Sequence, residues 1–140
     1  MKNVYLCLTV LLLSLAGCGK NVGVYGKVTF PDGMPLTKGS VIFQNERVMA
    51  QGHIQPDGRY ALGMLKDGDG CEPGSYQVFI SGASRVEPAP ERTKASDPVI
   101  DDKVTLLIDK EMTQPDTSGL ICVVKKGMKL PYNITVEPPK

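Results

Sequence analysis

The sequence has 140 residues, a length that suits one domain with a single hydrophobic core. Its 16 basic and 15 acidic residues leave a net charge of +1, and no block of like charge stands out. This balance argues against a nucleic-acid partner and against a polybasic membrane patch. The four cysteines and single histidine show none of the close ligand spacing of a zinc site.

The first 17 residues have the pattern of an export signal. Lys2 supplies a short positive start, residues 4–15 form an apolar run, and the small residues Ala16 and Gly17 precede Cys18. The run is shorter than the roughly 20 residues that span a bilayer, and no later stretch approaches that length. We therefore predict that residues 1–17 are removed and that no transmembrane helix follows.

The end of this signal, Leu15-Ala16-Gly17-Cys18, resembles a bacterial lipobox. The resemblance implies cleavage before Cys18 and attachment of a diacylglycerol and further acyl chains to that cysteine, which together give stable anchoring. Residues 18–21 would then be a lipidated tether that holds the protein on a membrane of the bacterial cell envelope. Gly19 follows the cysteine in place of the aspartate that commonly marks inner-membrane retention, which favours the outer membrane.

Between residues 22 and 80, short runs with strand-like patterns are separated by turn sequences. Residues 22–30 place apolar or small side chains at every second position, which is typical of a half-buried strand. Residues 40–44 are rich in β-branched and aromatic side chains and predict a second strand. Further strands are expected at 49–55, 59–64 and 75–80, and the tight turn at 56–58 should join the first two of these in an antiparallel hairpin.

The second half of the chain is less regular. Residues from about 83 to 102 are rich in proline and charge, so we expect a long exposed loop there. Strands return at 104–108, 119–124 and 132–136, and no window has the spacing of an amphipathic helix. These elements predict one all-β domain over residues 22–138, an antiparallel sandwich with a single core.

Several short motifs lie in the first half of this domain, namely Gly26-Lys27-Val28-Thr29-Phe30, Asp32-Gly33, Pro35-Leu36, Gly39-Ser40-Val41-Ile42-Phe43, Gly52-His53-Ile54, Asp57-Gly58-Arg59-Tyr60 and Pro73-Gly74-Ser75-Tyr76. Together they resemble a carboxypeptidase regulatory-like domain, and more narrowly the small lipoproteins with that domain in planctomycete-type bacteria. The resemblance implies a transthyretin-like Greek-key β-sandwich of seven to eight antiparallel strands that is not itself a peptidase.

Two cysteines remain once Cys7 leaves with the signal and Cys18 is lipidated. Cys71 and Cys122 form an even pair in an exported protein, which favours a disulfide between them. The alternative is two separate thiols, with Cys122 acting as a small buried hydrophobe because it shares the inward parity of its neighbours.

Candidates for chemistry are few. A Ser-His-Asp site would need the single histidine, His53, as its base, but His53 lies on the polar face of a predicted strand and is interpreted as a surface residue. Asp67, Asp69 and Glu72 could present oxygens to Ca²⁺, yet they lack the spacing of an EF-hand loop, which favours a solvated glycine turn. We expect no catalytic site, no metal and no cofactor.

The expected function is therefore non-enzymatic. We interpret the chain as a lipid-anchored envelope protein whose sandwich is a structural or protein-interaction module, with another envelope protein as its partner. Edge strands or the proline-rich loop would be the contact surfaces. The alternative is a carbohydrate-binding module for envelope or extracellular glycans, for which Tyr25, Phe79 and Tyr132 are the exposed aromatic candidates.

Overall fold

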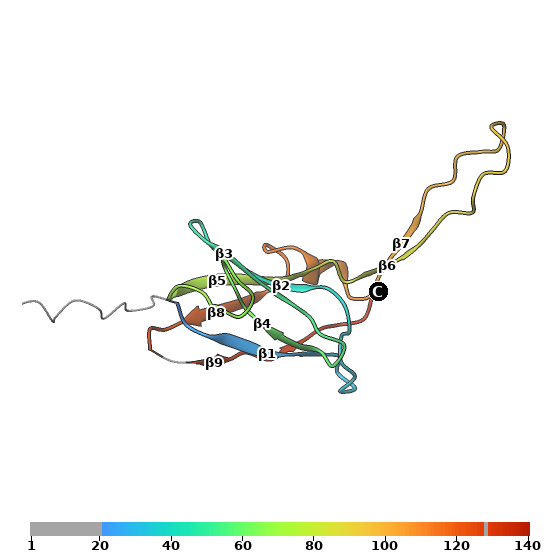
Figure 1. Ribbon diagram of the computed structural model, residues 1–140. Coiled ribbons are helices and arrows are strands. Elements are labelled where there is room, and N and C mark those ends of the chain that lie inside the picture. Colours follow the sequence, from blue (N-terminus) through green and yellow to red (C-terminus); the bar gives the residue numbers. More distant parts are fainter. Residues whose placement is uncertain (1–20, 128) are drawn as a thin grey trace, which may run out of the picture.

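Alternation of apolar and polar residues builds two facing sheets in the computed structural model, which describes residues 21–127 and 129–140 (Figure 1). The first sheet has the strand order β3-β2-β5-β8, and each neighbouring pair is antiparallel. Its members are β2 (Ser40–Gln44), β3 (Met49–His53), β5 (Gly74–Ser81) and β8 (Leu120–Val124).

The second sheet is built around β1 (Val24–Thr29). The strand β4 (Arg59–Ala61) pairs with β1 in the antiparallel sense, whereas β9 (Leu130–Pro131) and β10 (Ile134–Thr135) pair with it in parallel. The prediction of antiparallel strands alone is therefore wrong at this edge. The last segment of the chain runs in the direction of β1 and completes its second edge.

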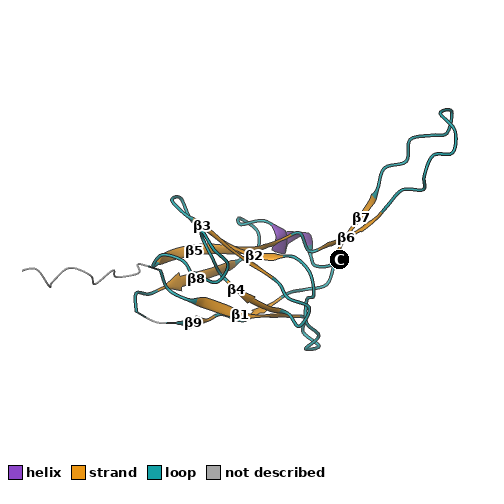
Figure 2. Ribbon diagram, viewed as in Figure 1, coloured by secondary structure: helices purple, strands orange, loops and turns teal. Residues whose placement is uncertain are grey.

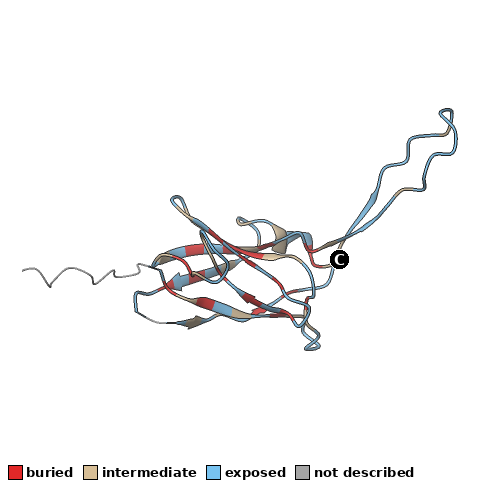
Figure 3. Cartoon of the chain, viewed as in Figure 1, coloured by how far each residue is buried: buried red, intermediate tan, exposed pale blue. Residues whose placement is uncertain are grey.

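The hydrophobic core lies between the two sheets, where Figure 3 shows the buried residues of facing strands. The alternation predicted for residues 75–80 is confirmed, because Tyr76, Val78 and Ile80 are buried while Ser75 and Gln77 are exposed. Opposite them, β1 contributes Val24 and Val28. The all-β sandwich predicted from sequence is the observed fold.

Close approach between segments fixes the identity of Gly26. A Cβ placed on this residue would lie 1.9 Å from the carbonyl oxygen of Tyr132 and 3.1 Å from the ring of Tyr60. The Tyr60 hydroxyl donates a hydrogen bond to that same carbonyl. Any larger residue would force β1 away from the segment that carries β9 and β10.

The hairpin expected between residues 49–55 and 59–64 is paired only near its turn and at one bridge farther from the turn. Gln55 N–H donates to the carbonyl of Arg59, and an isolated bridge joins Gln51 to Gly63. Otherwise the two strands separate, because β3 pairs with β2 in one sheet and β4 pairs with β1 in the other. The chain therefore crosses between the layers at this turn, where a simple hairpin was predicted.

The predicted loop at about 83–102 rises from a short two-stranded ladder. Its strands are β6 (Ser84–Glu87) and β7 (Lys103–Leu106), and they project away from the sandwich (Figure 2). The strand expected at 104–108 thus begins one residue earlier, and its first three residues are exposed. A 3₁₀ turn, η1 (Lys110–Thr113), follows β7. Among residues 21–127 and 129–140, no helix has the length and apolar character that a membrane span requires.

Candidate functional site

The first surface of interest is the projecting hairpin of residues 84–106, called the arm below. Val86 and Val104 are directly paired across its two strands, so their side chains share one face, and both are exposed. Val99 and Ile100 are exposed farther along the loop. The arm thus presents four large apolar side chains to solvent, and Figure 3 shows that the projecting segment is exposed along nearly its whole length.

Polar contacts shape the arm. Just beyond the β6–β7 ladder, the Asp102 carboxylate accepts a hydrogen bond of 2.9 Å from Ala89 N–H. At its tip, Asp97 Oδ2 accepts from Lys94 N–H at 2.8 Å, from the Thr93 hydroxyl at 3.0 Å and from Thr93 N–H at 3.1 Å. These bonds, the one from Lys94 most of all, hold the pKa of Asp97 below its usual range. Side-chain caps of this kind fix a loop without a hydrophobic core.

The second surface is a groove on the outer face of β1 and β4. Tyr25 on β1 lies directly opposite Ala61 on β4, and both are exposed. His53, Gln55 and Arg59 line one part of the groove, and the cavity there has a volume of about 470 Å³. These side chains come from β1, from the end of β3 and from β4. The end of β3 lies beside β4 because the turn at 55–59 joins the two strands.

Two polar groups of the groove already have partners. Nδ1 of His53 lies 2.9 Å from the hydroxyl of Ser40, its direct cross-strand neighbour, so Nε2 is the ring nitrogen that a ligand would meet. The guanidinium of Arg59 lies 3.4 Å from the Asp57 carboxylate. His53 is an exposed surface residue as predicted, but its contact with Ser40 was not expected from the sequence.

The loop at residues 64–70 forms another wall of the groove, where Asp67 and Gly68 lie. Asp69 holds this loop from within, because its carboxylate accepts from the backbone N–H groups of Met64, Leu65 and Lys66 at 2.7, 3.3 and 3.2 Å. The bond from Met64 is the main cause that lowers the pKa of Asp69. The carboxylate is thus occupied in shaping the wall.

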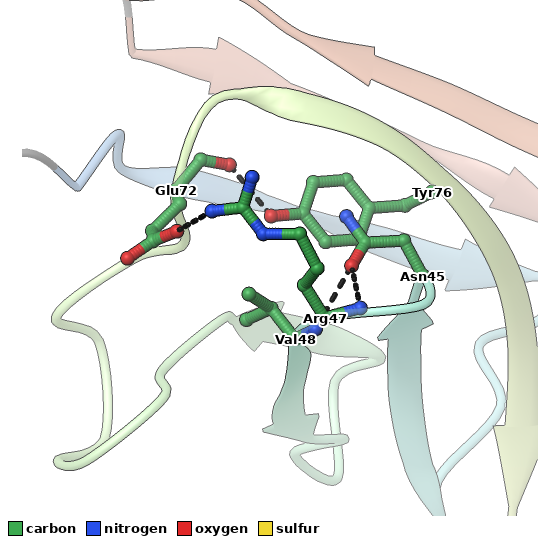
Figure 4. Close-up of polar contacts among 5 residues, drawn as sticks. All are labelled: Asn45, Arg47, Val48, Glu72 and Tyr76. Carbon is green, nitrogen blue, oxygen red and sulfur yellow. Dashed lines mark hydrogen bonds and ion pairs between the residues drawn. The ribbon is translucent and has the colours of Figure 1, made fainter.

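The weak calcium candidate is not assembled. Asp69 is turned toward its own loop backbone, and Glu72 forms an ion pair of 3.8 Å with Arg47, whose side chain reaches toward it in Figure 4. Figure 4 also shows the Tyr76 hydroxyl donating to the Glu72 carbonyl and the Asn45 amide oxygen accepting two backbone N–H groups. Within residues 21–127 and 129–140, no three His, Cys, Asp or Glu side chains form a metal-binding group.

Cys71 and Cys122 are buried free thiols, and the bridge predicted between them is absent from the structure. Cys71 sits where the chain pairs with Val22, whereas Cys122 pairs with Tyr76 in the β5–β8 ladder. Burial raises the pKa of the Cys71 thiol to about 11, and the nearby Cys122 adds to this shift. Such thiols behave as small hydrophobes with low reactivity.

The aromatic candidates differ in position. Tyr25 is 46% exposed and lies in the groove. Tyr132 is partly buried and packs edge-on against the Phe43 ring, with centroids 5.6 Å apart, and Phe79 is also only partly exposed. Tyr25 is therefore the one of the three that offers its ring to a ligand. The lipidation residue predicted at position 18 lies outside the described residues.

No protein-family model matches the chain, and no curated protein matches it. Among solved structures, the chain is similar to a DUF3823 family protein from Bacteroides ovatus, with 16% sequence identity and a TM-score of 0.43. The match covers 84% of this chain and 45% of the other, so the chain spans less than half the length of that neighbour.

Proposed function

We propose that this chain is a non-enzymatic, lipid-anchored interaction module of the bacterial cell envelope, and that it contacts a partner protein through the arm. The observation that carries the proposal is the set of exposed apolar side chains on the arm: Val86, Val99, Ile100 and Val104. Apolar side chains gathered on a projecting element are typical of a protein-binding surface. The backbone of β6 and β7 also offers outer edges to which a partner strand can add.

The arm lies at the opposite end of the sandwich from the start of β1 (Figure 1). At that start, Val22 N–H donates to the Cys71 carbonyl at 2.7 Å, and Cys71 N–H donates back at 3.0 Å. Four residues of extended chain span at most roughly 14 Å, so a lipid on Cys18 would hold this end close to the membrane. The arm would then point away from the membrane, where a partner can reach it.

Particular residues also support the proposed cellular location and the proposed absence of catalysis. The export signal and Leu15-Ala16-Gly17-Cys18 support a lipidated envelope protein, and Gly19 favours the outer membrane. The motifs shared with carboxypeptidase regulatory-like domains support an accessory module. His53, the single histidine, contacts the Ser40 hydroxyl through Nδ1, where a catalytic base is usually oriented by a carboxylate.

The proposal is tested by photo-cross-linking in intact cells. A photoreactive amino acid replaces Ile100 on the arm or, as the control, Val123 on β8, since these residues are 55% and 56% exposed. We expect a discrete protein adduct from position 100 and none from position 123. In a parallel culture, a Cys18→Ser variant should lose the incorporation of labelled fatty acid that the unchanged chain shows. Equal adducts from both positions, or no adduct from position 100, would overturn the protein-interaction role.

A further inference from the structure

We infer that the groove on β1 and β4 is a second binding site, separate from the arm, and that it takes a neutral glycan chain. Two hollows adjoin along this face, with volumes of about 470 and 410 Å³, and they share Tyr25, Ala61 and Gly68. The second hollow continues from Tyr25 toward Gly23 and Lys129. A trench of this form suits several consecutive sugar rings, with Tyr25 at the junction of the two halves.

The floor of the trench matches the apolar face of a sugar ring. Tyr25 is the cross-strand neighbour of Ala61, and a Cβ placed on Gly68 would meet nothing within 4 Å, so the lining stays open there. An exposed aromatic ring has a partially negative π-face that can contact the C–H groups on the apolar face of a pyranose. Tyr25 pairs with Ala61 on one side and with Pro131 on the other, so its ring stands on a strand that is held at both edges.

The walls of the trench carry side chains that can form hydrogen bonds with the hydroxyl groups of a sugar. His53, Gln55, Arg59 and Asp67 line the first hollow and combine donors with acceptors. A few such polar groups around an apolar floor are the usual composition of a small-ligand site. Planar side chains with two polar atoms, such as Gln55 and Asp67, can bind two neighbouring hydroxyls of one ring.

The charge balance indicates a neutral ligand. The charge of Arg59 is offset by Asp57 at 3.4 Å, and the lining of the two hollows holds one further cation, Lys129, and one carboxylate, Asp67. A site for an acidic sugar or a phosphate would require an excess of positive charge or a bidentate arginine without a carboxylate partner. The trench provides neither, so binding should depend little on salt.

The test uses the full lipidated chain in a detergent without a sugar headgroup, titrated by calorimetry. The probes are β-1,4-glucan, β-1,4-mannan and α-1,4-glucan hexasaccharides, with an oligogalacturonate of similar length as the charged probe. We expect at least one neutral probe to bind with a Kd below about 1 mM, with little change on added salt. Absence of binding by all three neutral probes, or binding of the galacturonate alone, would overturn the inference.

Three variants connect binding to the trench. Tyr25→Ala should weaken the Kd about tenfold, whereas Tyr25→Phe keeps the ring and should stay within about twofold. Ile121→Ala, on the outer face of the other sheet, is the control and should bind as the unchanged chain does. An unchanged Kd in Tyr25→Ala would also contradict the inference. Because Tyr25 is remote in sequence and strand from the arm, cross-linking from position 100 should persist in Tyr25→Ala, so the two proposals fail separately.

Discussion

The sandwich and the arm both consist of paired strands, but different forces hold them. In the sandwich, β5 places Tyr76, Val78 and Ile80 in a core that excludes water. In the arm, the paired residues Val86 and Val104 remain exposed, and carboxylates that accept backbone N–H groups set the shape. The buried apolar residues of the sandwich are therefore explained by folding. Those in the arm have no such explanation, which is why we assign them to binding.

The sharpest comparison replaces a valine by alanine in each region. Val78→Ala removes two buried methyl groups from a fully buried position, which should lower the free energy of unfolding by about 2–3 kcal/mol. Val104→Ala is the matched control in the arm and should change it by less than about 0.5 kcal/mol, because that side chain is 61% exposed. Urea denaturation of both variants measures the difference. Similar losses would mean that the arm is part of the cooperative core.

A second comparison uses two glycines three positions apart, Gly26 within β1 and Gly23 just before it. Gly26→Ala should lower the free energy of unfolding by about 1–3 kcal/mol, because the added methyl group meets the Tyr132 carbonyl oxygen at 1.9 Å. Gly23→Ala should be tolerated, since the nearest atom to its new methyl group is Lys129 Cγ at 3.7 Å. Thermal unfolding of the two variants measures this. Equal tolerance at both positions would contradict the close packing of β1 against the C-terminal segment.

Sequence patterns predicted the sandwich better than the groove, for physical reasons. Strict alternation identifies which side chains of residues 75–80 point inward, because strand periodicity is a local property. The strand partners depend on distant segments, so neither the parallel pairing of β9 and β10 with β1 nor the separation of β3 from β4 followed from local signals. The composition of residues 83–102 indicated exposure, but only tertiary structure shows that the ladder at its base projects.

The groove could not be predicted from the sequence for a similar reason. Tyr25 was identified as an exposed aromatic from its parity, and His53 as a surface residue. Their meeting in one groove requires the turn at 55–59 to cross between sheets, which the sequence suggested only as a hairpin turn. The inward role of Asp69 had a weak signal, since aspartate in a glycine-rich loop often accepts backbone N–H groups.

The last comparison is of stability at low pH, and it uses a feature that both regions have, a carboxylate that accepts backbone N–H groups. Asp69 in the sandwich and Asp97 in the arm each accept backbone N–H groups from residues three to five positions earlier, and each pKa is lowered from the ordinary value of 3.8. A lowered pKa in the folded state means that the unfolded chain takes up the proton first as pH falls. The stabilisation is thus complete above pH 3.8 and is lost below it, toward the folded pKa.

The two residues should differ in what their protonation affects. Asp69 fixes a loop that is joined to the core, because Gly70 N–H donates to the carbonyl of the buried Leu62. Asp69→Asn should therefore reduce the fall in the free energy of unfolding between pH 5 and pH 2. Asp97→Asn should leave this pH dependence unchanged and should alter only the hydrogen exchange of the amides of Thr93 and Lys94. Chemical denaturation from pH 5 to pH 2, with amide exchange by NMR, separates the two effects. If Asp97→Asn changed the global curve as much as Asp69→Asn, the arm would share the stability of the sandwich, and its exposed valines would again be open to a folding role.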